Sequence, residues 1–177
     1  MARIQTINRQ TASAEINATL DAVKAKMGKV PNLIATLAQA PVALNAYLSL
    51  SEAASKGRLS AKQSESLALA IGQANSCQYC LSAHSLIAKG AGLNSEAIQS
   101  ARQASAEDAL TDALLKLAVK IVQQRGLLSD EDFAEAYLAG VDDGMVLEVI
   151  TSVALNTLTN YTNHIAQTDI DFPVVTL

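Results

Sequence analysis

The stretch ESLALAIGQANSCQYCLSAH, residues 65–84, holds both cysteines of the chain and one of its two histidines. Leu67 and Ile71 lie one helical turn apart in its first half, a spacing that favours an amphipathic helix. The polar residues Asn75 and Ser76 then interrupt the apolar pattern, and a second helix is expected to carry the cysteines. The stretch therefore predicts two helices joined by a tight turn.

The rest of the chain is also predicted to be helical. Of its 177 residues, 50% are hydrophobic, only 3% are aromatic, and there are 8 glycines and 3 prolines. A chain rich in alanine and leucine and poor in helix breakers favours an all-α fold. We expect a single domain over residues 1–177, a helical bundle whose signature region covers 60–90.

Capping residues and helix breakers place the other helices. The expected helices are one over residues 13–28, two that begin at Pro31 and Pro41, one that begins at Ser60 with Gln63, and three with starts at Asn94, at Ser105 with Asp108, and at Ser129 with Asp132. A final helix over 144–168 is apolar over most of its surface and is predicted to be buried, with an extended tail after it.

A short internal repeat accompanies two of these starts. The tetrapeptide GRLS at 57–60 precedes the helix pair that leads to the cysteines, and GLLS at 126–129 precedes another helix pair. This similarity is typical of an internal duplication of a helix-pair unit, with the cysteines kept in the first copy.

Composition limits the partners of the chain. A formal net charge of −4 argues against nucleic acid and anionic membranes as partners. The sequence has no apolar run long enough to span a bilayer and no signal-peptide pattern in MARIQTINRQ, so we expect a cytoplasmic protein. It also lacks a phosphate loop or dinucleotide fingerprint, so we expect no cofactor.

The two cysteines have the spacing of a redox pair. On a helix, Cys77 and Cys80 are three residues apart and His84 follows four residues later, so all three share one face. With Ser76 as the N-cap, Cys77 takes position N1 and Cys80 position N4, where the helix dipole favours a thiolate. The pattern therefore predicts a reversible dithiol/disulfide centre, beside which His84 can relay a proton.

The residues alone leave other interpretations open. Glu65, on the preceding helix, is a candidate general base for a thiol, although its position also fits a solvated surface glutamate. Cys77, Cys80, His84 and His164 supply enough ligands for zinc, provided that His164 converges from far along the chain. The two cysteines also fit a buried, inert pair in the core.

Glu65, Cys77, Cys80 and His84 together keep the spacings of a known signature: a glutamate, eleven residues, C-x-x-C, three residues and a histidine. The span 65–84 thus resembles the alkylhydroperoxidase D-like proteins of the carboxymuconolactone decarboxylase superfamily. The C-terminal segment NYTNHIAQTDIDFP is similar to that of the peroxidase-related branch.

The resemblance implies an antioxidant enzyme, a thiol-dependent oxidoreductase that reduces organic hydroperoxides. In that family the second cysteine, here Cys80, attacks the hydroperoxide and becomes a sulfenic acid, which Cys77 resolves to a disulfide. The resemblance assigns Glu65 as the general base, with His84 in the proton relay. It also implies a dithiol electron donor, such as a lipoylated protein or another thiol carrier, and a homo-oligomer, a trimer or hexamer.

One position departs from the family pattern. Well-studied members have a histidine directly before the second cysteine, where this chain has Tyr79. A tyrosine, with a reference pKa of about 10, is a poor proton relay near neutral pH. The alternative function is therefore a thiol–disulfide oxidoreductase or redox sensor without efficient peroxide turnover. The sequence also leaves open whether Tyr161 and Asn163 face the site or an oligomer contact.

Overall fold

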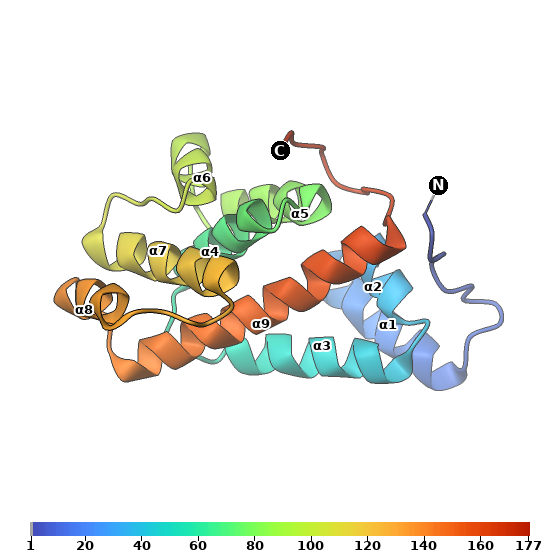
Figure 1. Cartoon of the computed structure of the whole chain (residues 1–177). Helices are drawn as coiled ribbons and strands as arrows, with labels where there is room; N and C mark the ends of the chain where they lie inside the picture. The colour runs from blue at the N-terminus through green and yellow to red at the C-terminus, as the bar shows by residue number, and fades with distance from the viewer. Residues whose placement is uncertain (1) are drawn as a thin grey trace.

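The computed structural model describes residues 2–177, and all regular secondary structure in this range is helical. The predicted all-α class is confirmed (Figure 1). The helices of the described residues are α1 (Ala14–Met27), α2 (Asn32–Leu37), α3 (Pro41–Ala54), α4 (Ala61–Ala74), α5 (Gln78–Gly90), α6 (Ser95–Arg102), α7 (Ala109–Gln124), α8 (Asp130–Leu138) and α9 (Asp143–Ala166). Within residues 2–177, no helix combines the length and the hydropathy that crossing a membrane requires.

The long helix α9 runs across the molecule, and α2, α3, α4, α5 and α7 pack against it (Figure 1). Buried hydrophobic residues form two clusters, one built mainly on α4, α6, α7 and the first half of α9, the other on α1, α2, α3 and the start of α5. Leu81 belongs to the first cluster and Cys80 to the second. The two clusters therefore meet at the beginning of α5.

The capping residues place several helix starts correctly. Ser60 Oγ accepts the backbone N–H of Gln63 at 3.2 Å, and Gln63 Oε1 accepts the backbone N–H of Ser60 at 3.0 Å, so the predicted capping box forms. Ser129 and Asp132 form the same reciprocal pair at the start of α8. The two repeated tetrapeptides therefore share a local structure, although the duplication itself stays a prediction.

The predicted helix start at Ser105 is wrong. The Ser105 backbone N–H donates to Ser100 O at 3.0 Å and so still belongs to the turn that closes α6. Asp108 is the N-cap of α7, with its Oδ1 accepting the Thr111 N–H at 2.8 Å. The carboxylate thus caps the helix three residues later than the serine would.

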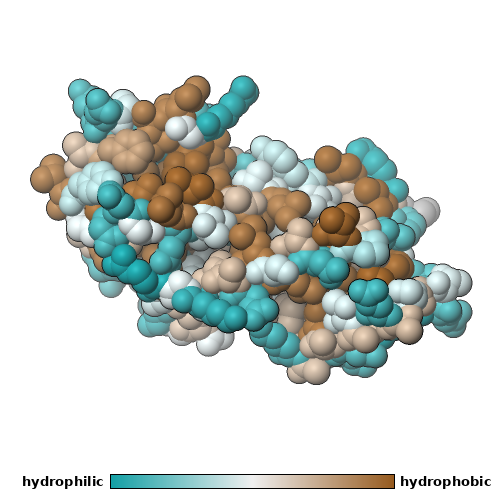
Figure 2. Space-filling model, turned by 90° about the horizontal axis from the view of Figure 1, so that it is seen from below, coloured by the Kyte–Doolittle hydropathy of each residue, from teal (hydrophilic) through white to brown (hydrophobic). Residues whose placement is uncertain are grey.

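The prediction that α9 is buried over most of its surface is also wrong. Leu147, Ile150, Tyr161 and Ile165 lie at helical spacing along one side and are between 45% and 64% exposed. The helices α2, α3, α4, α5 and α7 pack against α9 and leave that side uncovered. Figure 2 shows further hydrophobic side chains on the underside, around the connection between α8 and α9.

Candidate active site

The turn between α4 and α5 sets the position of the cysteines. Ser76 has a left-handed backbone, with φ of 55°, and the following Cys77 N–H donates to Gly72 O at 2.8 Å. Ser76 therefore closes α4 and does not cap α5. Cys77 is itself the N-cap, and its Sγ accepts the Cys80 N–H at 3.4 Å. The predicted register is wrong by one residue, since Cys80 takes position N3 and not N4.

Cys77 and Cys80, termed the thiol pair below, are 1% and 3% exposed, and both are free. Their Sγ atoms lie 2.9 Å apart, within hydrogen-bond reach. The N–H groups at the start of a helix favour negative charge on such a sulfur. Because bonded sulfurs are about 2.05 Å apart, the pair can pass between dithiol and disulfide with a small movement.

Glu65 of α4 and His84 of α5 form a carboxylate–imidazole pair beside the thiol pair. Glu65 Oε2 lies 2.8 Å from His84 Nδ1, and the two side chains are 18% and 24% exposed. Burial lowers the pKa of His84, but the Glu65 carboxylate and the charge at Cys80 outweigh burial, so the net pKa is raised. The structure thus places the four residues of the predicted constellation in one site.

The two thiols differ in acidity. The hydrogen bond with Cys77 lowers the pKa of Cys80 to about 6 against the effect of burial, and the charge of His84 lowers it further. The same hydrogen bond, together with burial, raises the pKa of Cys77. At neutral pH, Cys80 is therefore the thiolate and Cys77 is the thiol that donates to it.

Two asparagines of α9 complete the surroundings of the thiol pair. Asn163 Nδ2 donates to Cys80 Sγ at 3.3 Å and lies 4.0 Å from Cys77 Sγ, so Asn163 faces the site. Asn160, one turn earlier, accepts a hydrogen bond from Asn75 Nδ2 on its Oδ1 at 2.9 Å. Sequence reasoning left open whether Asn163 faces the site and missed Asn160. The available signal was a pair of asparagines three residues apart within an apolar helix.

Tyr79 lies between the two cysteines in sequence but points away from them. Its hydroxyl donates to Asp171 Oδ1 at 2.7 Å and accepts the Leu33 N–H at 3.1 Å. Its ring meets the Phe172 ring edge-on at a centroid distance of 5.7 Å. Burial raises the pKa of Tyr79 well above its usual range. Tyr79 therefore fastens the C-terminal tail to α2 and α5, and its hydroxyl has no free role in a proton relay.

His164 points outward from α9. It is exposed and stacks on Tyr161, with ring centroids 6.4 Å apart, so Tyr161 also faces the surface. The zinc interpretation needed His164 beside the cysteines. Across residues 2–177, no group of three or more histidine, cysteine, aspartate or glutamate side chains is arranged to hold a metal ion.

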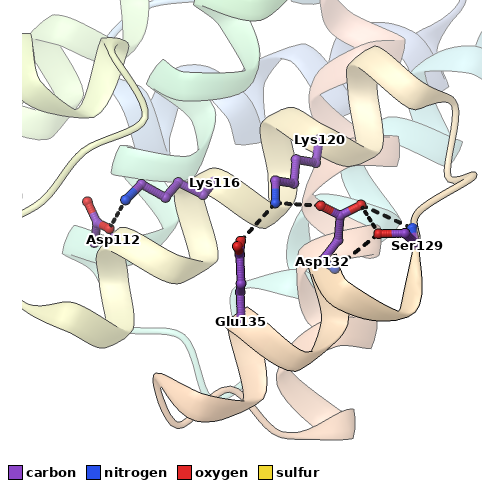
Figure 3. Close-up of polar contacts among 6 residues, drawn as sticks. All are labelled: Asp112, Lys116, Lys120, Ser129, Asp132 and Glu135. Atoms are coloured by element: carbon purple, nitrogen blue, oxygen red, sulfur yellow. Dashed lines mark hydrogen bonds and ion pairs between the residues drawn. The ribbon is translucent and has the colours of Figure 1, made fainter.

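A separate groove of about 380 Å³ lies between α7 and α8 (Figure 3). Lys116 pairs with Asp112 at 2.7 Å, and Lys120 pairs with Asp132 at 2.5 Å and with Glu135 at 3.0 Å. Each charged side chain drawn in Figure 3 has a partner of opposite charge. The groove is lined by neither cysteine and is not part of the candidate active site.

The fold and the site together define the chain as an all-helical protein with a C-x-x-C thiol pair beside a glutamate–histidine pair. Residues 41–124 match the model of the carboxymuconolactone decarboxylase family. The predicted resemblance to the alkylhydroperoxidase D-like proteins of the carboxymuconolactone decarboxylase superfamily is thereby confirmed. No curated protein matches the sequence of this chain.

Three solved structures share the fold over nearly the whole chain. An uncharacterized peroxidase-related protein from Ralstonia eutropha JMP134, described as an alkylhydroperoxidase AhpD core, has a TM-score of 0.86 and 22% identity over 96% of this chain and 92% of its own. A peroxidase-related protein from Silicibacter sp. TM1040 has a TM-score of 0.81 and 18% identity over 94% and 92%. A cysteine-to-alanine variant of the debrominase Bmp8, in complex with 2,3,4-tribromopyrrole, has a TM-score of 0.80 and 18% identity over 96% and 91%. At these identities the similarity shows the fold and not the reaction.

Proposed function

We propose that the chain is a thiol-dependent peroxidase that reduces organic hydroperoxides through the thiol pair. The observation that carries the proposal is the contact between Cys80 and Cys77, whose Sγ atoms are 2.9 Å apart. The Cys80 pKa of about 6 makes it a thiolate at neutral pH, and the thiolate is the nucleophilic form of cysteine. A resolving thiol in contact with such a nucleophile is what a sulfenate cycle requires.

The reaction proceeds in three balanced steps. The Cys80 thiolate attacks the distal oxygen of the hydroperoxide, the O–O bond breaks, and Cys80 becomes a sulfenic acid while the alkoxide leaves and takes up a proton. Cys77 then attacks the Cys80 sulfenic sulfur, and water leaves as the disulfide forms. A dithiol donor reduces the disulfide by exchange and is itself oxidised to a disulfide.

Glu65 and His84 serve the proton movements in this proposal. The Glu65 carboxylate raises the pKa of His84 against the effect of burial and so favours the protonated imidazole, which is a suitable proton donor to the leaving alkoxide. Glu65 holds the imidazole through the 2.8 Å contact and accepts a proton when Cys77 is activated. Both side chains reach solvent in part, which allows proton exchange with water.

The alternative function is a thiol–disulfide oxidoreductase or redox sensor. The observation that favours it is the position of Tyr79, whose hydroxyl is fully engaged with Asp171 and Leu33. The site then has one proton-transferring side chain fewer than the family members with histidine there. Exchange between dithiols and disulfides does not need that residue, because the leaving group is a thiolate.

The dithiol donor is expected to be a lipoylated protein or another thiol carrier, in a reducing compartment such as the cytoplasm. A homo-oligomer, a trimer or hexamer, is also expected. The exposed side of α9 that carries Leu147, Ile150, Tyr161 and Ile165 supports a protein contact, because an apolar helix face gains by leaving water. Light scattering after size exclusion measures the oligomer directly.

The test is consumption of an organic hydroperoxide with dihydrolipoamide as reductant. We expect turnover by the native chain, none by Cys80→Ser, and a single sulfenate without further turnover by Cys77→Ser. If the native chain consumes no hydroperoxide while its disulfide exchanges rapidly with dihydrolipoamide, the peroxidase proposal fails and the oxidoreductase alternative replaces it.

A further inference from the structure

One amide side chain of α9, that of Asn163, reaches the thiol pair, and the amide of Asn160 lies one helical turn before it. Asn160 is 0% exposed and Asn163 is 5% exposed. Asn163 donates to Cys80 Sγ at 3.3 Å. The buried Asn160 Nδ2 and Asn163 Oδ1 atoms have no hydrogen-bond partner within the described residues. Burying amide groups without partners costs free energy, so their place beside a sulfur calls for a functional explanation.

The orientation of Asn160 is fixed by a third asparagine. Asn75, the C-cap residue of α4, donates from its Nδ2 to Asn160 Oδ1 at 2.9 Å. The Asn160 oxygen is thereby engaged while its buried Nδ2 has no partner, and Asn160, like Asn163, adds to the lowering of the Cys80 pKa that the hydrogen bond with Cys77 causes in the main. The carboxyl end of α4 thus positions an amide that acts on the thiol at the start of α5.

We propose that Asn160 and Asn163 form an amide cradle that holds Cys80 as the attacking thiolate and stabilises the reduced thiol pair relative to its disulfide. The proposal rests on the thiol chemistry of the proposed function. It adds two residues to that chemistry and assigns them a redox role.

The redox role follows from the charge that the cradle faces. A thiolate is a good hydrogen-bond acceptor, whereas a disulfide sulfur is neutral and accepts weakly. Donors that bind the thiolate therefore stabilise the reduced form and make the disulfide a stronger oxidant. For a peroxidase this favours fast reduction by the dithiol donor, which returns the enzyme to its active form.

Other groups also act on Cys80, and the test must separate them from the cradle. Cys77 and His84 lie on α5 itself, Glu65 acts from α4, and Tyr47 faces the site from α3. Burial and then the negative charges of Cys80 and Glu65 raise the pKa of Tyr47, so it is the neutral phenol at neutral pH. The α9 contribution comes from uncharged amides and is removed without changing any charge.

Asn163→Ala and Asn160→Ala test the cradle, and Asn156→Ala is the matched control. Asn156 is a buried asparagine of α9, 7% exposed, and it donates to the Ser152 carbonyl at 2.9 Å and not to a sulfur. The fraction of Cys80 thiolate is read from its ultraviolet absorbance against pH. The reduction potential is read by equilibrating the chain with dihydrolipoamide and lipoamide and counting alkylated thiols.

We expect loss of one cradle donor to raise the Cys80 pKa by about one unit, because hydrogen bonds to charged groups are the strong ones. At pH 8.5, Cys80 is a thiolate in both the native chain and the variant. The shift therefore lowers the ratio of reduced to oxidised protein tenfold, which lowers the reduction potential by about 30 mV for a two-electron couple. The control is expected to leave both quantities unchanged. If one of the two cradle variants fails to fold, its helical circular dichroism signal is lost. The other cradle variant then tests the proposal.

These readouts separate the cradle from the peroxidase proposal. If the pKa and potential shift as expected but the native chain consumes no hydroperoxide, the cradle stands and the peroxidase proposal fails. If the native chain turns over hydroperoxide while folded Asn163→Ala and Asn160→Ala keep the native pKa and potential, the cradle is overturned. The cradle is equally overturned if Asn156→Ala shifts both quantities as much as they do.

Discussion

The helix pairs α4–α5 and α8–α9 begin with the same capping geometry but surround their ionisable groups differently. In the first pair, Glu65 is 18% exposed and faces His84 beside the thiol pair. In the second pair, Glu135 of α8 is 75% exposed and meets Lys120 of α7, with both side chains lining the groove between these helices (Figure 3). Charges couple strongly only where water is largely excluded. The same start of a helix therefore precedes a buried thiol pair in one place and a solvated ion pair in the other.

Helix α9 takes part in both regions. Its inner side supplies Asn160 and Asn163 to the thiol pair, and its outer side exposes Leu147 and Ile165. The second helix pair thus contributes to the site through uncharged amides, while its carboxylates contact other parts of the chain, such as Glu148, which accepts the Arg58 and Leu59 N–H groups before α4. The predictions below test whether this division holds.

The largest effect is expected for Glu65→Gln. The substitution keeps the size of the side chain but removes the charge that offsets the burial of His84, so the pKa of His84 falls. A neutral His84 neither lowers the Cys80 pKa nor donates a proton, and loss of such catalysis costs about 100-fold or more in kcat/KM. Steady-state turnover of an organic hydroperoxide measures this. Glu135→Gln is the matched control, and equal losses in the two variants would remove the distinction between the regions.

A large effect of pH is expected on the reactivity of Cys80. Its pKa of about 6 lies below the ordinary value of 9.0, so alkylation by iodoacetamide should be fast above pH 7 and fall tenfold per unit below pH 6. The free energy of unfolding depends on pH in the same direction. The stabilisation by the Cys80 thiolate is fully present above pH 9 and is lost as the pH falls through about 6. Alkylation rates of the reduced chain between pH 5 and 9 check this, and a midpoint near 9 would contradict it.

Local spacing predicted that Cys77, Cys80 and His84 share one helix face, and the family resemblance added Glu65. The structure brings these four residues close together because they belong to two consecutive helices and the turn between them. The asparagines of α9 come from about 80 residues later in the chain, so their approach depends on tertiary packing that spacing does not encode. The register at Ser76 was missed because its left-handed backbone has no periodic signal. An apolar helix also carries no sign of which side its own chain will cover, as the exposed side of α9 demonstrates.

A moderate effect on stability, with little effect on turnover, is expected for Tyr79→Phe. The change removes the hydroxyl that bridges Asp171 and the buried Leu33 N–H, which should lower the free energy of unfolding by about 1–3 kcal/mol. Urea unfolding measures the loss. Tyr137→Phe is the control, because that exposed tyrosine also donates to an aspartate, Asp143, at 2.6 Å. A strong loss of turnover in Tyr79→Phe, with the fold intact, would show that this tyrosine takes part in proton transfer.

The smallest effect is expected for Lys120→Ala in the groove between α7 and α8. The lysine pairs with Asp132 and Glu135, but the carboxylate of Asp132 keeps its hydrogen bonds to Ser129 when the lysine is absent. The pair with Glu135, whose side chain is 75% exposed, gains little because water screens both charges. Neither the urea midpoint nor the hydroperoxide turnover should change measurably, whereas Asp132→Ala should lower the midpoint because it also breaks the capping box. A loss of turnover in Lys120→Ala would show that the groove communicates with the thiol pair, and the α8–α9 pair would then share in the chemistry that we propose for α4, α5 and the inner side of α9.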